Sequence, residues 1–427
     1  MKVLIVGGGG REHAIALKIK ENPEVTALYA APGNGGIAQI ATCLPFKATD
    51  VDGIVRWAAE NKVDFVIVAP DDPLCLGMVD ALAAQGIPAF GPRKNAAIIE
   101  GSKVFSKNLM KKYGIPTAAY ETFDDYDAAV KYLQTADMPI VVKADGLALG
   151  KGVLICPDRE SAVEAVASMM KEAKFGASGA RVVIEEFLTG PEVSVLAFTD
   201  GKTVKPMVSS MDHKRALDHD EGLNTGGMGT IAPNPCYTPE MAQRCMDEIF
   251  LPTIAAMNAE GRTFTGCLYF GLMMTPKGPK VIEYNCRFGD PETQVVLPLL
   301  KSDLLTIMRA TVDGTLADTP VEFASGAACC VVLASGGYPV SYKSGYPISG
   351  LDEAGKTATV FHAGTKLVDG QIVTAGGRVL GVTATADTLE AAIDKAYQAA
   401  DKITFTDMHM RRDIGQRALA SRKESHS

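Results

Sequence analysis

Residues Val3–Arg11 read VLIVGGGGR, and this stretch indicates the fold of the N-terminal part of the chain. The run Val3–Val6 is apolar and rich in β-branched side chains, as in a strand that is buried on both faces of a parallel sheet. Four glycines then turn the chain, and Arg11–Lys20 follows with a helical pattern. A strand, a tight turn and a helix in this order predict the start of an open α/β sheet.

Strands and helices continue to alternate as far as Phe90. Further strands are expected at Val25–Ala30, Asp64–Ala69 and Ile87–Phe90, and helices at Gly53–Asn61 and Leu74–Gln85. The first three strands end in Gly7–Gly10, Pro32–Gly36 and Pro70–Pro73. Because ligands of such sheets bind at the carboxyl ends of the strands, these turns predict a binding site.

The glycines at 7–10 do not match the dinucleotide fingerprint G-x-G-x-x-G. Read from Gly7, the last position is Glu12, and shifting the frame by one residue does not restore the motif. The second strand ends in Ala31-Pro32 and lacks the acidic residue that holds a ribose, so a nicotinamide cofactor is not expected. Backbone N–H groups beside Arg11 could instead bind a phosphomonoester, and a tight turn without a ligand is the alternative.

The segment Gly146–Gly152 (GLALGKG) does not match the P-loop motif either. That motif needs four residues between its glycines and Ser or Thr after its lysine, whereas here Gly152 follows the lysine. We interpret the segment as a mobile hairpin that closes over nucleotide phosphates. Lys143, at the end of the preceding apolar strand, is expected to point into the same space, and a solvated lysine is the alternative.

Residues 102–323 mix helices with antiparallel strands, which predicts one α+β domain built from two lobes. Helices are expected at Lys103–Tyr113, Ser161–Lys174 and Thr238–Ala259. Strands are expected at Ile140–Lys143, Gly152–Cys156, Val182–Phe187, Glu192–Phe198, Lys205–Val208, Gly266–Met274 and Lys280–Arg287. The polar, glycine-rich stretch Asp212–Gly229 has the length of an active-site lid.

The predicted fold therefore combines α/β and α+β parts. It has an N-terminal open parallel-sheet domain (1–101), the two-lobed central domain (102–323, with a lid lobe at 118–190) and a small β-rich C-terminal domain (324–427). The last domain has short strands at Ala328–Leu333, Ala358–Phe361 and Arg378–Thr385, and its polar end, Ser421–Ser427, is expected to be disordered.

The stretch Val281–Phe288 (VIEYNCRF) carries the clearest local signal for chemistry. In a strand, alternate residues share a face, so Glu283, Asn285 and Arg287 form one polar row with neighbours about 7 Å apart. The opposite face is apolar and consists of Ile282, Tyr284, Cys286 and Phe288. Carboxylate and amide oxygens suit Mg²⁺ or Mn²⁺ shared with nucleotide phosphates, and an arginine binds phosphate or carboxylate. The alternative is the exposed polar face of an edge strand.

Two weaker patterns lie elsewhere in the central region. Glu185 and Glu186 end an apolar strand and could accept from an adenine amino group or a ribose hydroxyl, with a solvated strand edge as the alternative. His213 and His219 lack a third ligand, so a zinc site is not expected.

Composition limits the possible partners. The 427 residues carry a net charge of −8, with 47% hydrophobic and 22% charged residues. These values exclude disordered and fibrous classes and argue against nucleic acid or an anionic membrane as the main partner. The nine cysteines are scattered without a CxxC pair, as in a cytosolic protein with reduced thiols. No apolar run reaches the ~18–20 residues of a membrane helix, so a cytoplasmic protein is expected.

Several longer motifs resemble those of the phosphoribosylamine–glycine ligase (glycinamide ribonucleotide synthetase) family of ATP-grasp enzymes. They are Gly7–Ala14 (GGGGREHA), Ala31–Gly36 (APGNGG), Val142–Val153 (VKADGLALGKGV), Asp212–Arg215 (DHKR), Asn224–Gly229 (NTGGMG), Asn285–Gln294 (NCRFGDPETQ), Phe361–Thr365 (FHAGT) and Gly376–Leu380 (GGRVL). The motifs cover essentially the whole chain in the family's order.

The resemblance implies a central ATP-grasp domain, an N-terminal phosphosugar-binding domain and a C-terminal domain that helps to close the site. It implies a ligase of de novo purine biosynthesis that joins glycine to 5-phospho-D-ribosylamine. ATP would be cleaved to ADP and phosphate through a glycyl phosphate intermediate. The implied partners are these small molecules and Mg²⁺ or Mn²⁺, with no nucleic acid or membrane, and the expected form is a cytoplasmic monomer.

The resemblance also implies roles for individual residues. Metal ligands would be Glu283 and Asn285, and the catalytic residues would be Arg287, Lys143 and Asp212. ATP would be held by Lys103, Lys143, Gly150, Lys151, Gly152, Glu185, Glu186, Leu188 and Glu192. The substrates would be bound by Gly9, Gly10, Arg11, Glu12, His13, Asn34, Asp212, Gly226, Gly227, Arg287 and Arg378.

Two departures from the family pattern concern acidic residues. Many ATP-grasp enzymes place another metal carboxylate on the preceding strand, but Gly266–Met274 contains no acid. Asp71 in Ala69–Pro73 (APDDP) stands where Gly-Pro-Glu is expected, so it would keep the acidic role at shorter reach. Two other functions stay open at this point. They are a purine-pathway ATP-grasp carboxylase or formyl ligase, and a catalytically silent nucleotide-binding regulator.

Overall fold

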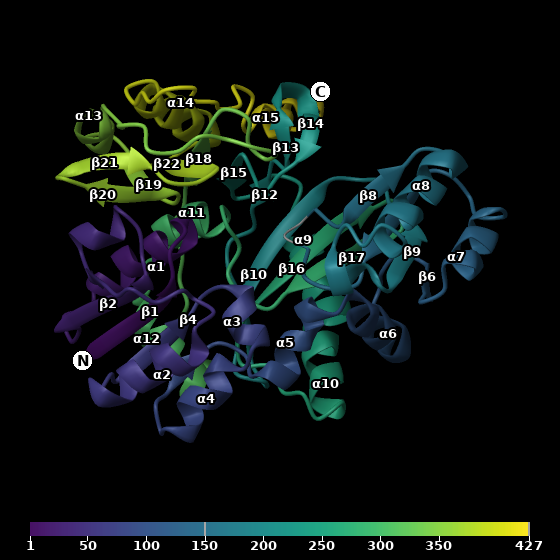
Figure 1. The fold of residues 1–427 in the computed structure, drawn as a ribbon, viewed down its shortest axis with the longest axis horizontal. Helices are drawn as coiled ribbons and strands as arrows, with labels where there is room; N and C mark the ends of the chain where they lie inside the picture. The colour runs from purple at the N-terminus through teal and green to yellow at the C-terminus, as the bar shows by residue number, and fades with distance from the viewer. Residues whose placement is uncertain (149–150, 426–427) are drawn as a thin grey trace.

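The computed structural model describes residues 1–148 and 151–425. The chain forms an N-terminal sheet, two central sheets and a C-terminal sheet, and the predicted fold class is confirmed (Figure 1). The N-terminal sheet and the C-terminal sheet lie on one side of the view, and the small lobe made of β6–β9 projects on the other. In the described part of the chain, no helix is both long and apolar enough to cross a membrane.

The N-terminal region is a parallel sheet with the strand order β3-β2-β1-β4-β5. Its strands are β1 (Lys2–Gly7), β2 (Ala27–Pro32), β3 (Thr42–Cys43), β4 (Phe65–Val68) and β5 (Ala89–Phe90). Its helices are α1 (Gly10–Lys20), η1 (Ile37–Gln39), α2 (Val51–Glu60), α3 (Asp71–Cys75), α4 (Met78–Ala84) and α5 (Lys94–Gly101). The strand order reverses between β1 and β4, which is where ligands of such sheets bind.

The small lobe of the central region is an antiparallel sheet, β6-β9-β7-β8. Its strands are β6 (Tyr120–Phe123), β7 (Ile140–Ala144), β8 (Val153–Cys156) and β9 (Val182–Glu186). Helices α7 (Tyr126–Leu133) and α8 (Arg159–Met170) pack on the sheet, η2 (Gly176–Gly179) precedes β9, and α6 (Lys103–Tyr113) leads into the lobe. The lobe has its own hydrophobic core, which includes Leu133, Val142 and Met169.

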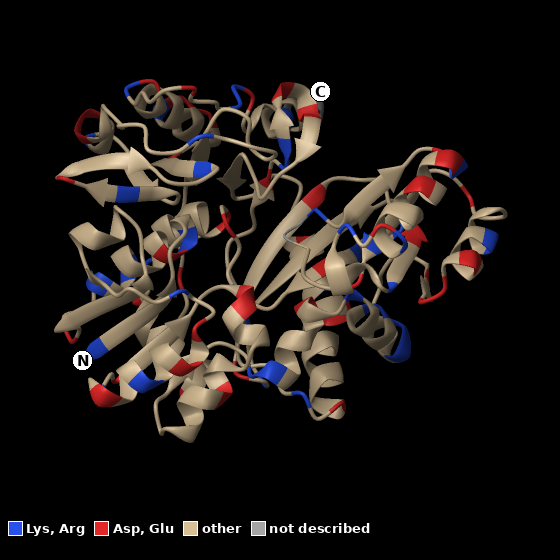
Figure 2. Ribbon diagram, viewed as in Figure 1, with Lys and Arg blue, Asp and Glu red and all other residues tan. Residues whose placement is uncertain are grey.

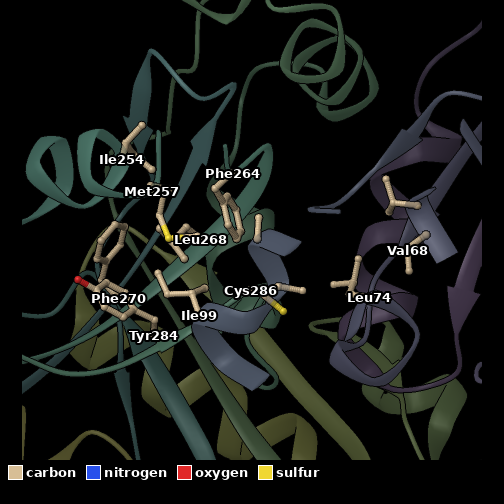
Figure 3. Close-up of a cluster of buried hydrophobic side chains, with 14 of the residues drawn as sticks. Val68, Leu74, Ile99, Ile254, Met257, Phe264, Leu268, Phe270, Tyr284 and Cys286 are labelled. Carbon is tan, nitrogen blue, oxygen red and sulfur yellow. The ribbon is translucent and has the colours of Figure 1, made fainter. Parts of the chain in front are cut away.

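The larger lobe is a second antiparallel sheet, β11-β10-β16-β17. Its strands are β10 (Glu192–Thr199), β11 (Val204–Pro206), β16 (Gly266–Thr275) and β17 (Gly278–Asn285). The elements packed near it are α9 (Pro239–Cys245), the π-helical η4 (Met246–Phe250) and α10 (Leu251–Ala259). Figure 3 shows Tyr284 and Cys286 pointing into the core of this lobe together with Ile99 of α5, so β17 is anchored from one face.

The C-terminal region is an antiparallel sheet, β12-β15-β18-β22-β19. Its strands are β12 (Met211–Asp212), β15 (Gly229–Ala232), β18 (Ala327–Ala334), β19 (Thr359–His362) and β22 (Arg378–Ala386). Two hairpins accompany it, β13 (Arg215–Leu217) with β14 (Glu221–Asn224) around η3 (Asp218–Asp220), and β20 (Thr365–Val368) with β21 (Gln371–Thr374). Its helices are α13 (Leu351–Gly355), α14 (Leu389–Ala400) and α15 (Gln416–Ser425).

The three regions are not independent along the chain, because elements from one part of the sequence pack in the sheet or core of another region. Strands β12 and β15 come from the middle of the chain but complete the C-terminal sheet. The elements after β17 are α11 (Thr293–Val296), η5 (Leu297–Leu299), α12 (Leu304–Asp313) and η6 (Leu316–Asp318). Side chains of α12 share a hydrophobic core with Val3 and Ile5 of β1. The domain boundaries 1–101, 102–323 and 324–427 therefore stay a prediction.

Four local expectations differ from the structure. The helix expected at Leu74–Gln85 is split into α3 and α4 at Gly77, which has a left-handed φ of 88°. The helix expected at Thr238–Ala259 contains a π-turn just before Pro252, which lacks the N–H that an α-helix uses. The expected disorder of Ser421–Ser427 is wrong as far as Ser425, because α15 continues to that residue, and positions 426–427 lie outside the described residues.

The fourth difference lies on β17. The pairing of β16 with β17 shifts between Gly271 and Leu272, so one extra residue of β17 falls between Val281 and Glu283. Val281 is fully buried in the core, while Ile282 lines the central cavity beside Glu283. The prediction that Ile282 belongs to the apolar face is therefore wrong, because a bulge reverses the alternation of side chains at that point.

Candidate active site

A cavity of about 1010 Å³ lies where all the sheets meet. Most of the site residues expected from the sequence line it. They are Arg11, Lys103, Lys143, Lys151, Gly152, Glu185, Glu186, Leu188, Glu192, Asp212, Gly226, Glu283, Asn285, Arg287 and Arg378. Gly150 lies outside the described residues. The cavity thus brings together side chains from the N-terminal sheet, both central lobes and the C-terminal sheet.

Two lysines and one glutamate form a buried charge cluster on the small-lobe side. Glu185 of β9 pairs with Lys143 of β7 and with Lys107 of α6, the latter at 2.6 Å. Burial alone would raise the pKa of Glu185, but the two ammonium groups hold it below its usual value. Burial lowers the pKa of Lys107 to about 8. Figure 2 shows the concentration of lysine on α6, which delivers Lys107 to this cluster.

The start of the glycine-rich hairpin is tied to the first turn of α6. Asp145 accepts from the Ser102 hydroxyl and the Val104 N–H, both at 2.9 Å, and pairs with Arg181 at 2.6 Å. Lys103 donates to the Gly146 carbonyl at 2.9 Å. These contacts therefore fix the first residues of the hairpin beside Lys103 and Lys143.

Glu283 and Asn285 present oxygen atoms to the cavity from β17. In the amide orientation that satisfies its hydrogen bonds, Asn285 donates to Glu100 at 3.0 Å and to the Tyr284 carbonyl at 3.2 Å, which leaves its oxygen free of these contacts. Burial would raise the pKa of Glu283, but Lys214, at 3.5 Å, and the other cations lower it. Glu283 is therefore an ionised carboxylate next to an amide oxygen.

Arg287 is held from behind by a carboxylate that sequence reasoning missed. Glu100 of α5 pairs with Arg287 at 2.9 Å and also accepts from the Cys286 N–H at 2.7 Å. Burial raises the pKa of Glu100, while Arg287 opposes that shift. Asp71, at the start of α3, interacts with Arg287 and Arg11, which together lower its pKa although burial opposes them. The acid expected at position 71 thus lies at the site, beside two arginines.

A second acidic pair lies on the C-terminal side. Asp212 of β12 and Glu292 interact, and the pKa of each is raised, by burial first and, for Asp212, next by Glu292. Tyr269 donates to Glu292 at 3.3 Å and shares a 2.7 Å hydrogen bond with Ser194. Lys214 lies on the same wall, and Glu283 raises the pKa of its ammonium group well above the usual value. This wall attracts a cationic group.

Arg11 and Arg378 meet at Asp290. The Asp290 carbonyl accepts from Arg378 at 2.8 Å, and its carboxylate accepts from the Arg11 backbone N–H at 3.3 Å. Arg378 also donates to the Gly226 carbonyl at 2.8 Å, and Arg11 donates to the Phe288 carbonyl at 3.0 Å. Burial would raise the pKa of Asp290, but the two guanidinium groups lower it.

Six expected substrate-binding residues do not line the cavity. They are Gly9, Gly10, Glu12, His13, Asn34 and Gly227. Glu12 accepts from the Gly9 N–H at 2.8 Å and so caps α1. His13 accepts from the His362 N–H at 2.7 Å, and Asn34 donates to the His362 carbonyl at 2.8 Å. These side chains join the N-terminal region to the C-terminal one, and their role toward a ligand stays a prediction.

The cavity residues that were not assigned a role from the sequence include five charged ones: Glu100, Lys107, Lys214, Asp290 and Glu292. Lys214, Asp290 and Glu292 lie inside the quoted motifs DHKR and NCRFGDPETQ, so their position was a usable signal. Glu100 is an acidic residue in the helical stretch that forms α5, and Lys107 is one of several lysines in α6. The local sequence does not show which residues they pair with.

Among the described residues, no group of three or more His, Cys, Asp or Glu side chains could hold a metal ion. The donors present are one carboxylate and one amide oxygen, which fit a hard cation that takes its remaining oxygens from phosphates and water.

Comparison with known proteins places all three regions in one family. Residues 1–100, 101–293 and 328–417 match the models of the N domain, the ATP-grasp (A) domain and the C domain of phosphoribosylglycinamide synthetase. A phosphoribosylamine–glycine ligase of Halalkalibacterium halodurans is 48% identical over 425 residues, with 100% of this chain and 99% of the relative covered. One of Agrobacterium fabrum is 49% identical over 423 residues, with 99% and 100% covered.

Solved structures also resemble this chain over nearly its whole length. The crystal structure of a phosphoribosylamine–glycine ligase from Thermotoga maritima has a TM-score of 0.86 at 34% identity and covers 97% of this chain and 100% of that one. Biotin carboxylase from Campylobacter jejuni has a TM-score of 0.73 at 15% identity, with 96% and 92% covered, which shows a shared fold alone.

Proposed function

Since the chain belongs to the phosphoribosylglycinamide synthetase family of ATP-grasp ligases, we propose that it joins glycine to 5-phosphoribosylamine in purine biosynthesis and cleaves ATP to ADP and phosphate. The observation that carries the assignment is the composition of the cavity. It holds a phosphate-binding side with lysines, an acidic pair for an amino group and an arginine between them, all from one chain.

ATP is assigned to the side between the two lobes. Lys103 and Lys143 are the cations for its phosphates, and Lys151 and Gly152 of the hairpin cover them. On the adenosine side lie Glu186 at the end of β9, Leu188 in the connection after it and Glu192 at the start of β10. Both oxygens of Glu185 face lysines, so Glu185 supports this site by holding Lys143 in place, and Lys107 helps to keep it ionised.

Mg²⁺ or Mn²⁺ is assigned to Glu283 and Asn285. Their two oxygens face the same cavity as Lys103 and Lys143. When bound there with ATP, such a cation neutralises phosphate charge and favours transfer of the γ-phosphoryl group. Gly271 lies opposite Glu283 on β16, where a Cβ atom would meet the Glu283 side chain at 2.9 Å. A side chain at position 271 would therefore displace Glu283, so glycine at this position leaves room for the Glu283 carboxylate.

Glycine is assigned to the space between Arg287 and the Asp212–Glu292 pair. The Arg287 side chain lines the cavity and is 19% exposed, so the accessible part of its guanidinium can donate to a substrate carboxylate. Burial raises the pKa values of the Asp212 and Glu292 carboxyl groups, and an ammonium group bound between them would stabilise their ionised forms. A glycine zwitterion supplies both charges.

Phosphoribosylamine is assigned to the end of the N-terminal sheet. Arg11 and Arg378 are the cations for its phosphate, and Asp71 and Asp290 are acceptors for ribose hydroxyls. The backbone N–H groups at the start of α1, near Gly9 and Gly10, lie on the same side, since a Cβ atom on Gly9 would meet the Asp290 carboxylate at 3.1 Å.

The proposed order of events is the one that membership of the family implies. A glycine carboxylate oxygen attacks the γ-phosphorus of ATP, ADP leaves, and glycyl phosphate forms. The sugar amine then attacks the glycyl carbonyl carbon, phosphate leaves, and an amide bond remains. Lys103, Lys143 and Arg287 offset the repulsion between the anions. The acyl phosphate must be shielded from water, and residues 147–148, 151–152 and part of the segment 212–229 line the cavity, where they can do this.

We also propose a cytoplasmic monomer. The cavity is lined by residues of one chain, so a second copy is not needed to complete it. All nine cysteines are free thiols, which suits a reducing compartment.

The test is ADP release from ATP and phosphoribosylamine with and without glycine. Glycine-dependent ADP release with formation of the amide product is expected. Turnover that depends on bicarbonate or formate instead would assign the chain to a carboxylase or formyl ligase. Absence of any turnover with bound nucleotide would assign it to a non-catalytic regulator.

A further inference from the structure

The segment after α14 lies along the residues that follow β12. His409 exchanges both backbone hydrogen bonds with Ala334 of β18, at 2.8 Å each, and its ring contacts the Ala216 carbonyl at 2.7 Å. The segment His409–Arg417, which we call the C-terminal clamp, thereby bridges the C-terminal sheet and the hairpin β13–β14. Neither the ligand assignments nor the motifs quoted above use this segment.

Arg411 is the centre of the clamp. Its side chain is only 1% exposed although it carries a charge. It forms a two-pronged pair with Asp413, at 2.8 Å and 2.9 Å, and donates to the Arg215 carbonyl and to Asp220, both at 3.1 Å. A buried guanidinium is stable only when its donors are satisfied in this way, so the hairpin and the clamp hold each other.

The hairpin turn is held in an unusual backbone conformation. His219 and Asp220 have φ values of 61° and 56°, in the left-handed region that most side chains avoid. Asp413 accepts from the His219 N–H at 2.9 Å, and Arg417 pairs with Asp220 at 2.7 Å. Three groups of the clamp segment, Arg411, Asp413 and Arg417, thus fix the turn.

His213 links the C-terminal clamp to the wall of the cavity. Its Nδ1 atom lies 3.1 Å from the Gly229 carbonyl, and its Nε2 atom accepts from the Gly415 N–H at 3.1 Å. These two contacts require the neutral ring with the proton on Nδ1. Burial lowers the pKa of His213 to about 4, in agreement with that form. The His213 ring therefore connects β15 to the C-terminal clamp through these two hydrogen bonds.

His213 is the direct chain neighbour of two residues that line the cavity. It lies between Asp212 and Lys214, and in extended backbone the neighbours of a residue point to the opposite side. His213 is buried toward the clamp, while Asp212 and Lys214 both line the cavity. Their backbone is also fixed by the His213 N–H, which donates to the Gly229 carbonyl at 2.9 Å.

We propose that Arg411 and His213 are positioning residues for the reaction, and that the C-terminal clamp sets Asp212 and Lys214 in place from behind. This inference rests on the proposed function, because Asp212 is assigned there to the amino group of glycine. A shift of the reacting groups by about 1 Å can cost on the order of 100-fold in rate. Loosening the clamp should therefore weaken the use of glycine before it weakens the binding of ATP.

The experiment compares the full-length chain with Arg411→Met and His213→Leu at saturating ATP and phosphoribosylamine. The matched control is Arg412→Met, which removes the neighbouring arginine, whose 57% exposed side chain pairs with Asp401 at 2.6 Å. We expect the KM for glycine to rise about tenfold or more in both clamp variants. The affinity for ATP, measured by direct titration, should change by a smaller factor than the KM for glycine, since Lys103, Lys143 and Glu185 lie on other elements. The clamp reaches the ATP side through Lys214, which lies 3.5 Å from Glu283 and 4.0 Å from Glu192. The control should match the wild type.

The split between KM and kcat separates positioning from a loss of fold. Partial unfolding lowers the concentration of active enzyme and thus the maximal rate, but it leaves the KM for glycine unchanged. An unchanged KM for glycine in both variants would therefore overturn the proposal. Should Arg411→Met fail to fold, Arg411→Lys and His213→Gln keep part of the contacts, and the same criterion applies to them.

The variant Asp212→Asn distinguishes this inference from the proposed function. With the wild type active, an unchanged KM for glycine in Asp212→Asn would refute the glycine assignment. If Asp212→Asn raises that KM, the double variant with Arg411→Met should raise it by less than the product of the two single effects, because both act through one group. Multiplicative effects would refute the link between clamp and site.

Discussion

Arg287 is paired with Glu100 at 2.9 Å, and its Nε atom is left without a partner among the described residues. The guanidinium is thus fixed from the side of α5, and the Arg287 side chain also lines the cavity. Both side chains are largely buried, at 19% and 6% exposure. Removing one partner of such a pair leaves an uncompensated charge, which decides the first prediction.

Glu100→Ala should destabilise the protein and impair catalysis together. Loss of one partner of a buried ion pair costs about 3–5 kcal/mol, so the thermal midpoint should fall, and the KM for glycine should rise because Arg287 loses its orientation. Calorimetry and steady-state kinetics measure the two effects. Glu24→Ala removes a carboxylate that is 62% exposed and pairs with Arg309 on the surface, and it should leave both values unchanged. A normal KM for glycine in Glu100→Ala would show that Arg287 is oriented without Glu100.

Glu283→Gln and Asn285→Ala should raise the concentration of Mg²⁺ or Mn²⁺ needed for half-maximal activity. Residues that only support a ligand affect metal affinity by about 10–100-fold, so direct oxygen donors should have at least that effect. A metal titration of ADP release at fixed ATP, together with metal-dependent nucleotide binding, measures it. Wild-type metal dependence in both variants would remove these residues from the metal site.

Asp145→Asn should weaken ATP binding with less effect on the maximal rate. The carboxylate caps α6 at Val104 and anchors the glycine-rich hairpin through Arg181, so its loss loosens both Lys103 and the hairpin. A rise of about tenfold in the KM for ATP is expected, with the KM for glycine unchanged. Asp158→Asn is the matched control, because Asp158 caps α8 and asparagine caps equally well. Equal KM values for ATP in the two variants would contradict the role of Asp145.

Stability should fall as the pH drops below about 6.5, in part through buried neutral histidines. Burial lowers the pKa of His13 to about 3 and that of His362 to about 4. Between those values and 6.5 the unfolded chain binds protons that the folded chain does not, so the free energy of unfolding rises with pH in this window. Each such histidine contributes up to about 1.4 kcal/mol per pH unit.

His13→Asn tests this directly. The asparagine oxygen can still accept from the His362 N–H but does not titrate, so the variant should lose less stability between pH 6.5 and 4.5 than the wild type. Urea unfolding at several pH values gives the slope. The exposed His219 is the control, and His219→Asn should keep the wild-type slope. Equal slopes for wild type and His13→Asn would mean that His13 is protonated in the folded state.

The structure agrees with the sequence where the signal is local. The polar row Glu283, Asn285 and Arg287 faces the cavity as the alternation on one strand predicts. Ile282, one residue before that row, was placed on the wrong face, because the bulge in β17 depends on its pairing with β16. Long-range pairing has no periodic trace in the sequence, so a bulge of this kind is invisible before the strands are paired.

The candidate site shows the same division. Lys143 lies in a quoted motif and Lys103 was implied by the family resemblance, and both line the cavity, but Glu100 could not be assigned to Arg287 from the sequence. The Glu100 carboxylate and the Cys286 backbone that it also binds are 186 residues apart. His213 and Gly415, which meet in the clamp, are 202 residues apart.

The amino-acid sequence by itself determined the strand–turn–helix start at Val3–Arg11, the fold class and the polar row on β17, because these depend on local sterics and on the periodicity of neighbouring side chains. Only the tertiary structure decided that Glu100 holds Arg287 and that β12 joins the C-terminal sheet. It also decided that Arg411 and His213 support Asp212 from behind. Such contacts arise when distant elements close their loops and pack their cores, and buried charges then find partners that no local pattern specifies.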